Sequence, residues 1–181
     1  NLDRVRAPLK KLRSLDYGWW VAITGMANMT ITSGPTFQGS SVLFSAIEAE
    51  FGWSRALVSG VASLGSLTMG VMGPLGGFLT DRLRPARMML FGLVLGGLGF
   101  ILLSRAQGPA GYYGAYLLVS VGFGMGGFLP AMTAVNAWLP RRRATGISLI
   151  VAGSSLGGLV VPALAWGITQ HGWRPTTFWI G

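Results

Sequence analysis

The sequence predicts an all-α polytopic membrane protein, and three observations lead to that fold class. Of the 181 residues, 51% are hydrophobic and only 10% are charged, which is well under half the charged share of a typical soluble domain. Long apolar runs alternate with short charged connectors, and each run can hold the ~20 residues that a helix needs to cross a bilayer. The basic residues of these connectors are divided unequally between the two sides of the predicted membrane.

Composition also argues against several classes of function. The sequence has no cysteine, which excludes disulfides and thiolate metal sites, and its one histidine and five acidic residues argue against any other metal site. The net charge of +9 is spread over the connectors and forms no continuous patch, so we expect no nucleic-acid partner. A nucleophile, a base and an orienting group converge on none of the apolar runs. We therefore expect neither an enzyme nor a cofactor.

The apolar runs predict five complete spans and the start of a sixth. The complete spans cover about residues 17–47, 54–80, 86–105, 108–139 and 144–169, and the incomplete sixth covers 174–181. Eight residues are too few to cross a bilayer, so we expect the chain to be a fragment. Residues 1–16 form a basic segment. Its leucines recur at helical spacing and favour a helix on the membrane surface, whereas Pro8 favours a disordered tail, and the sequence leaves both open.

The distribution of lysine and arginine predicts the orientation. Five of these residues lie in the N-terminal segment, three in the connector after the second span and three in the connector after the fourth. The opposite side holds only Arg55, Arg105 and Arg174. Cytoplasmic loops carry the excess of basic residues, so we expect the N-terminus and both arginine-rich connectors in the cytoplasm. The chain is then a multi-pass protein of the cell (inner) membrane, in contact with the lipid bilayer.

The first predicted span is polar where a lipid-exposed helix should be apolar. Polar side chains recur at every fourth position, at Thr24, Asn28, Thr32 and Thr36. Pro35 interrupts the helix just before Gln38, and broken helices at membrane depth are tolerated where they line a water-filled cavity. We therefore expect Asn28 and Gln38 to line a substrate cavity. The alternative is that the threonines bond back to their own helix and that Pro35 is only a kink.

Small residues form stripes along three of the spans. The second span carries the longest stripe: Ser59, Ser63, Ser66, Gly70, Gly73 and Gly77. The fifth span has Gly146, Gly153 and Gly157, and the third has Gly92 and Gly96. Such stripes let helix backbones approach closely in lipid, where apolar side chains alone give no drive for association. We expect tightly packed partner helices, at least one of them outside this chain.

Three motifs carry a resemblance to a known family. The stretch from Gly77 to Arg87, with Asp81 and Arg82, resembles the connector between spans two and three of major facilitator superfamily transporters. The acidic–glycine–tryptophan segment 16–20 and the aromatic–basic–small segment 138–153 resemble motifs of its monocarboxylate and oxalate/formate carriers. Four residues depart from the usual patterns of these motifs: Arg84, Ala86, Thr145 and Gly146. The departures weaken the assignment to the branch more than the assignment to the superfamily.

This resemblance implies an N-terminal six-helix bundle of a major facilitator fold, whose C-terminal six-helix half is absent from this chain. It implies a secondary transporter that moves a small organic anion by alternating access, coupled to protons or by exchange. Carried over by position, Phe37, Gln38, Phe128 and Ser154 would face the substrate, and we add Met132 beside the glycine-rich segment of the fourth span. Two alternatives stay open: a carrier of another small solute or drug, and a non-transporting membrane receptor or assembly fragment.

The charged connectors are the candidate cytoplasmic gate. Asp81 can attract a facing helix N-terminus or an arginine, and such a contact can hold one side of a carrier shut in one state. The candidate gate residues are Asp81, Arg82, Arg87, Arg141, Arg142 and Arg143. The alternative for the last three is that they only anchor the topology at anionic lipid headgroups. Because the five complete spans hold no charged residue except at their ends, the countercharge for an anion is expected from the missing half.

Overall fold

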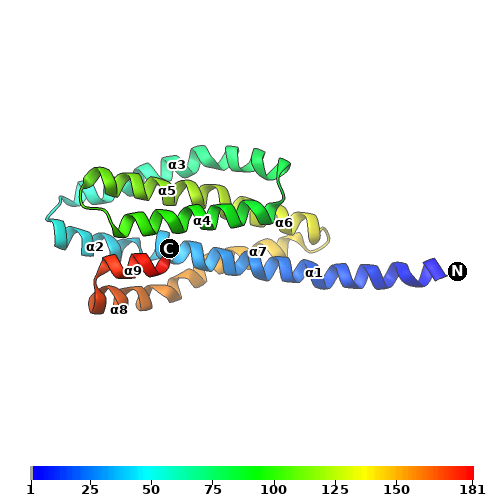
Figure 1. Cartoon of the computed structure of the whole chain (residues 1–181). Helices are drawn as coiled ribbons and strands as arrows, with labels where there is room; N and C mark the ends of the chain where they lie inside the picture. The colour runs from blue at the N-terminus through cyan, green and yellow to red at the C-terminus, as the bar shows by residue number, and fades with distance from the viewer. Residues whose placement is uncertain (1) are drawn as a thin grey trace.

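The computed structural model describes the backbone of residues 2–181 and the side chains of residues 17–80 and 82–181. Every secondary-structure element in this part of the chain is helical. In order, the elements are α1 (Leu2–Ser33), the π-helix η1 (Gly34–Gln38), α2 (Ser40–Phe51), α3 (Arg55–Arg82), α4 (Pro85–Ser104), α5 (Pro109–Gly126), α6 (Phe128–Trp138), α7 (Arg143–Leu156), the 3₁₀-helix η2 (Gly157–Val160), α8 (Val161–His171) and α9 (Trp173–Ile180). They lie side by side in an elongated bundle, from which the N-terminal end of α1 projects (Figure 1).

Four segments are long and apolar enough to cross a membrane: Arg55–Thr80, Pro85–Ser104, Pro109–Trp138 and Arg143–His171. They correspond within a few residues to the second, third, fourth and fifth spans expected from the sequence. The first expected span is formed by the C-terminal part of α1 together with η1 and α2. The backbone of the basic N-terminal segment continues α1, while its side chains lie outside the described part of the structure.

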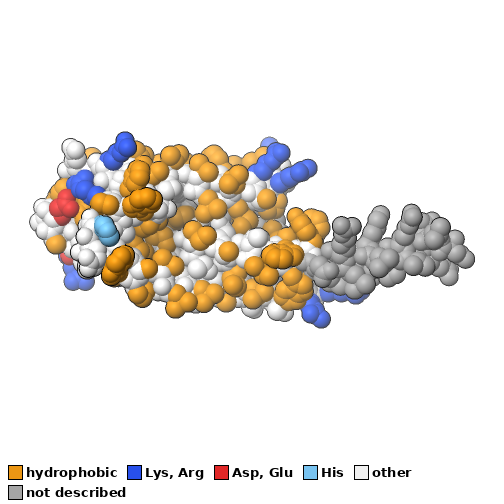
Figure 2. Space-filling model, turned by 60° about the horizontal axis from the view of Figure 1, so that its bottom comes forward, with side chains coloured by type: hydrophobic (Ala, Val, Ile, Leu, Met, Phe, Trp, Pro, Cys, Tyr) orange, Lys and Arg blue, Asp and Glu red, His pale blue; other side chains and the backbone are white. Residues whose placement is uncertain are grey.

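Charge and apolar surface are separated along the length of the bundle. Orange apolar side chains cover the middle of the face in Figure 2, and the charged side chains lie at the two ends. Large apolar side chains point outward from several helices, among them Leu67, Leu90, Val94, Leu159 and Trp179. Such an exposed apolar belt is stable against lipid tails and not against water. The fold is that of an all-α multi-pass membrane protein.

Glycines set a close helix contact between α4 and α5. A Cβ added to Gly122 would lie 2.5 Å from the backbone nitrogen of Gly96. Gly126 faces Gly92 at similarly close range. Only glycine allows two backbones to touch in this way, so the Gly92 and Gly96 pair expected to pack does so.

The fifth span packs against the first through the stripe expected from the sequence. A Cβ on Gly153 would collide with the carbonyl of Met26, and one on Gly157 would lie 2.8 Å from the backbone nitrogen of Gly34. Hydroxyls strengthen the same contact. Thr30 Oγ1 donates to the carbonyl of Gly153 at 3.0 Å. Helices α1 and α7 are therefore joined by close backbone contact and by hydrogen bonds.

The stripe of small residues on α3 does not pack within this chain. Ser59, Ser63, Ser66 and Gly70 are exposed, while Gly73 and Gly77 are half-buried. The face of α3 that packs against α5 carries Val58, Val61, Gly65 and Gly76, which are buried. The reason is that Val58 and Val61 bury more apolar surface in the aromatic cluster than the serines would. Packing of the stripe against a helix outside this chain stays a prediction.

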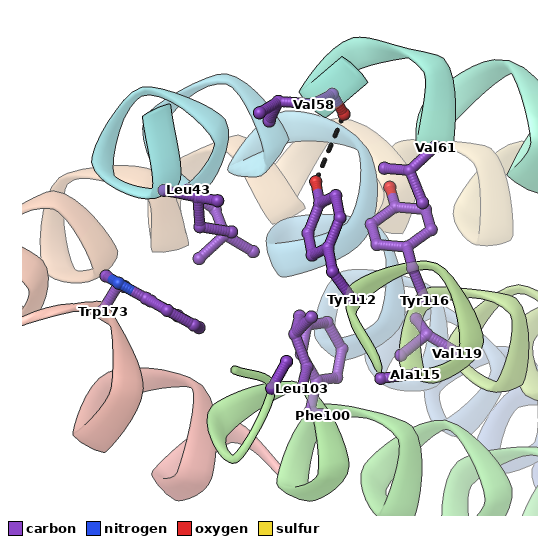
Figure 3. Close-up of a cluster of buried hydrophobic side chains, with 12 residues drawn as sticks. Leu43, Val58, Val61, Phe100, Leu103, Tyr112, Ala115, Tyr116, Val119 and Trp173 are labelled. Atoms are coloured by element: carbon purple, nitrogen blue, oxygen red, sulfur yellow. Dashed lines mark hydrogen bonds between the residues drawn. The ribbon is translucent and has the colours of Figure 1, made fainter. Parts of the chain in front are cut away.

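An aromatic cluster closes one end of the bundle, where α2, α3, α4, α5 and α9 meet. Tyr112 is buried among Val58, Phe100 and Leu103, and its hydroxyl donates to the carbonyl of Val58 at 3.2 Å (Figure 3). The next residue, Tyr113, donates to the carbonyl of Leu57 at 2.8 Å. Both acceptors lie in the first turn of α3. The two tyrosines therefore fix the start of α3 against α5.

Beside this cluster, an ion pair and two hydrogen bonds connect the start of α9 with the C-terminal ends of α2 and α4. Arg174 Nε in α9 lies 3.1 Å from Glu50 Oε1 in α2, and Arg174 Nη1 donates to the carbonyl of Ser104 at 3.3 Å. The indole nitrogen of Trp173 donates to the other oxygen of Glu50. Ser104 ends α4, where backbone carbonyls lack helical partners. The pair therefore fastens α9 to α2 and α4.

Candidate solute cavity

The interruption of the first span is where the candidate site begins. Pro35 has no N–H, and the chain around it adopts a π-helix over Gly34–Gln38, in which Gly39 N–H donates to the carbonyl of Gly34 at 2.7 Å. The interruption expected from the sequence is present. Gly34 faces the backbone of Gly157, and Phe37 on the same turn is 60% exposed. The π-helix thus turns an aromatic side chain out of the core.

A cavity of about 410 Å³ opens beside this turn, between α1, η1, α3, α5, α6 and α7. Its walls are mostly apolar, with a few hydroxyls. They are formed by Met29, Thr32, Ser33, Phe37, Met69, Gly73, Phe123, Gly124, Gly127, Phe128, Leu129, Val151 and Ser154. No charged side chain lines it within the described part of the chain. A solute in this cavity therefore meets aromatic and thioether surface and a few neutral hydrogen-bonding groups.

Three of the six expected cavity residues line this space, namely Phe37, Phe128 and Ser154. Phe128 comes from α6 and Ser154 from α7. The glycine break at Gly127 starts α6 and turns Phe128 into the cavity. These three residues line one cavity, and their role toward a substrate stays a prediction.

The other three expected residues lie elsewhere. Asn28 is buried, and its Nδ2 donates to the carbonyl of Gly126 at 3.3 Å. That carbonyl ends α5, where helical partners are missing, so Asn28 supports the α5–α6 junction. Gln38 is exposed outside the cavity, and Met132 is half-buried on α6. Their expected place in the cavity wall is not what the structure shows.

The threonines of the first span divide between the two interpretations. Thr24 donates to the carbonyl of Trp20 at 3.0 Å, and Thr32 donates to that of Asn28 at 2.8 Å. Both bond back to their own helix, as the alternative interpretation holds. Thr32 also lines the cavity. Thr36 differs, because its Oγ1 is buried without a hydrogen-bond partner among the described residues.

Several wall residues carried no signal that sequence reasoning would detect. Met29, Met69 and Phe123 are apolar residues on apolar helices, and nothing in their spacing separates a cavity wall from a lipid-facing surface. Ser33 was detectable, because it directly precedes the Gly34–Pro35 interruption. Its Oγ donates to the carbonyl of Ser154 at 3.0 Å, across the α1–α7 contact.

The connectors between α3 and α4 and between α6 and α7, which carry the candidate gate residues, lie at the end of the bundle opposite the connector between α8 and α9 (Figure 1). Arg82 ends α3, and its guanidinium lies over the ring of Phe78 at 4.4 Å from the ring centre. The other candidate arginines are exposed: Arg87, Arg141, Arg142 and Arg143. The backbone of Asp81 belongs to α3, but its side chain lies outside the described part of the structure. The gate role of these residues stays a prediction.

Comparison with known proteins adds the family. The model of the Major Facilitator Superfamily matches residues 19–181. Monocarboxylate transporter 13 of Rattus norvegicus is 24% identical over 164 residues, which are 87% of this chain and 37% of that protein. Monocarboxylate transporter 12 of Mus musculus is 25% identical over 169 residues, 92% of this chain and 35% of that protein.

A third relative has a different name. The Agnestins efflux protein AgnL12 of Paecilomyces divaricatus is 35% identical over 89 residues, 48% of this chain and 20% of that protein. The chain thus spans little more than a third of the length of the monocarboxylate transporters that it matches. The family match covers the cavity helices and the charged connectors together, and the relatives are named as transporters and not as enzymes. The chain belongs to the Major Facilitator Superfamily.

Proposed function

We propose that this chain forms the N-terminal bundle of a secondary carrier for small organic anions of the monocarboxylate class, which works by alternating access. The observation that carries the proposal is the cavity at the π-helical turn, with Phe37, Phe128 and Ser154 in its wall. The relatives named monocarboxylate transporters support the solute class. In this proposal the C-terminal bundle completes the site from the open side of the cavity.

The size of the cavity fits a small solute. Ligand pockets usually measure about 300–1,000 Å³ and are lined mainly by apolar and aromatic groups. At about 410 Å³, this cavity lies near the lower end of that range. The apolar part of a short-chain acid would lie against Phe37 and Phe128.

The charge of the solute requires a partner that this cavity wall does not offer. Burying an ionised carboxylate without a counterion costs a large desolvation energy. Among the described residues, the cavity wall holds no cation. The proposal therefore assigns the cation to the C-terminal bundle and proton coupling or exchange to the complete carrier.

The orientation and the gate belong to the same proposal. The arginine-rich end of the bundle would face the cytoplasm in the cell membrane, because of the excess of basic residues there. Asp81, Arg82 and Arg87, together with Arg141 to Arg143, would meet the C-terminal bundle in the outward-open state and part from it in the inward-open state. Arg174 and Glu50 would then lie on the outer side.

Uptake into proteoliposomes tests the proposal. The full-length carrier is reconstituted, and uptake of labelled lactate, formate and oxalate is compared with uptake of an uncharged solute of similar size, with and without a pH gradient. We expect uptake of at least one monocarboxylate, inhibited competitively by other short-chain acids. Uptake of the uncharged solute alone, unaffected by any acid, would contradict the proposal.

A second candidate is a carrier that exports an uncharged apolar metabolite. It is favoured by the aromatic and thioether side chains Phe37, Met69 and Phe128 in a wall without charge, and by the relative named an efflux protein. The same uptake panel separates the two candidates, since only the first predicts competition among acids.

A further inference from the structure

A second, smaller cavity lies beside the first, and five of its nine lining residues bear a hydroxyl group. Its volume is about 90 Å³, and it is bounded by η1, α2, α3 and α5. Phe37 and Met69 line both cavities and so form the partition between them. The oxygen-bearing walls of the smaller cavity, called here the hydroxyl pocket, are Thr36, Ser40, Ser66, Tyr116 and Ser120.

The hydroxyl protons of the three serines in the hydroxyl pocket are already donated to backbone carbonyls. Each donates to a backbone carbonyl three or four residues earlier in the chain at 2.9 Å: Ser40, Ser66 and Ser120. A hydroxyl group carries one donor and two acceptor lone pairs. The serines therefore present only acceptors to a ligand.

Thr36 differs from the three serines. The residue is only 4% exposed, and its Oγ1 has no hydrogen-bond partner among the described residues. Thr32 reaches the carbonyl four residues before it, but Thr36 lies in the wider π-helical turn, where that spacing is lost. Buried hydroxyls are almost always bonded, so an unbonded one in a cavity wall indicates that its partner comes from a ligand.

We propose that the hydroxyl pocket is a subsite for an uncharged hydroxyl group of the transported solute, which reaches it from the main cavity past Phe37 and Met69. Thr36 Oγ1 donates to the solute oxygen, and the lone pairs of the serines accept the solute proton. A carboxylate does not suit this pocket, because the serines present acceptors and no cation lines it. The inference rests on the proposed function and names a second polar group on its solute.

The size of the pocket limits what enters it. Water occupies ~30 Å³ per molecule in the liquid. A pocket of about 90 Å³ therefore accommodates a terminal CH₂OH group but not a ring or a branched chain. The carboxylate of the solute stays in the larger cavity, where the C-terminal bundle supplies its counterion. The preferred solute is thus a short straight-chain acid with a hydroxyl at its far end.

The relative uptake rates of two matched acids test the subsite. The full-length carrier in proteoliposomes is given butyrate or its terminally hydroxylated analogue at concentrations below KM, and the ratio of the two uptake rates is measured. Thr36→Val keeps the shape of the side chain and removes the hydroxyl, whereas Thr36→Ser keeps the hydroxyl. We expect wild type and Thr36→Ser to prefer the hydroxylated acid, and Thr36→Val to lower that preference about five-fold.

A second variant narrows the same pocket from another wall. The methyl group of Gly65→Ala would lie 2.8 Å from Ser120 Oγ and 3.0 Å from Tyr116 Cε1, so it should reduce uptake of the hydroxylated acid more than that of butyrate. Gly114→Ala on α5 is the control, because nothing lies within 4 Å of its added methyl group. If wild type transports butyrate and neither Thr36→Val nor Gly65→Ala changes the ratio, the pocket holds only water and the subsite is refuted. If wild type transports lactate or formate but neither of these two acids, the subsite alone is refuted. If it transports no monocarboxylate, the proposed function itself fails, and the subsite with it.

Discussion

Asn28 and Phe37 lie on the same span, yet only Phe37 lines the cavity. The polarity of Asn28 at membrane depth predicted a place in the cavity wall, but the structure gives this side chain a backbone partner instead. The free carbonyl at the end of α5 provides it, through the hydrogen bond from Asn28 to Gly126. Such a partner depends on how α5 and α6 meet α1, which no local pattern encodes. The helix interruption at Pro35 was predictable from the sequence, because the effect of proline on the backbone is local.

Asn28→Ala should lower stability and leave solute affinity unchanged. The substitution leaves the carbonyl of Gly126 buried without its donor, which costs roughly 1–3 kcal/mol. The measurement is the Tm of the detergent-solubilised carrier, together with the KM for its solute. A raised KM at an unchanged Tm would instead place Asn28 in the solute site.

Gly153→Ala should destabilise the contact between α1 and α7. The added methyl group would overlap the backbone of Met26, and overpacking of this kind costs typically ~1–3 kcal/mol. Gly158→Ala, a few residues on, is the control because nothing lies within 4 Å of its added methyl group. Thermal unfolding should separate the two variants. Equal Tm values would show that the close approach of α1 and α7 is absent in solution.

At the scale of elements, the spans were predictable and their packing faces were not. Span positions follow from apolar length, which is a local property of the sequence. On α3 the small-residue stripe faces outward while Val58 and Val61 face the aromatic cluster. Both faces of α3 are compatible with close packing, so the choice depends on the partner helix. Gly153 and Gly157 were predicted as a packing stripe and both contact the first span, although Ile150 of α7 also packs toward α1 at Gly25.

The ion pair between Glu50 and Arg174 should hold α9 with modest strength. Both side chains are partly exposed, and pairs of this kind contribute about 0.2–1 kcal/mol. Glu50→Gln should therefore speed amide hydrogen exchange in α9 by only a few-fold, with Glu48→Gln as the control for loss of the same charge. An unchanged exchange rate in Glu50→Gln would mean that the aromatic cluster alone holds α9.

At the scale of the whole molecule, the orientation can be measured directly. The chain has no cysteine, so labelling of a single introduced cysteine shows on which side of the membrane that position lies. Ala86 and Gln107 are exposed at the two ends of α4. In intact cells, a membrane-impermeant maleimide should label Gln107→Cys and leave Ala86→Cys unlabelled until the cells are opened. The reverse pattern would invert the topology that the arginines predict.

The central claim is that the cavity beside the π-helical turn carries the solute. Ser154 lines this cavity and Leu159, five residues later, is 75% exposed on the outer surface. Uptake of a labelled monocarboxylate by the full-length carrier in proteoliposomes should be abolished by Ser154→Trp, because the indole fills the cavity. The same measurement on Leu159→Trp should give nearly the wild-type rate. Wild-type uptake by correctly inserted Ser154→Trp protein would place the solute path elsewhere.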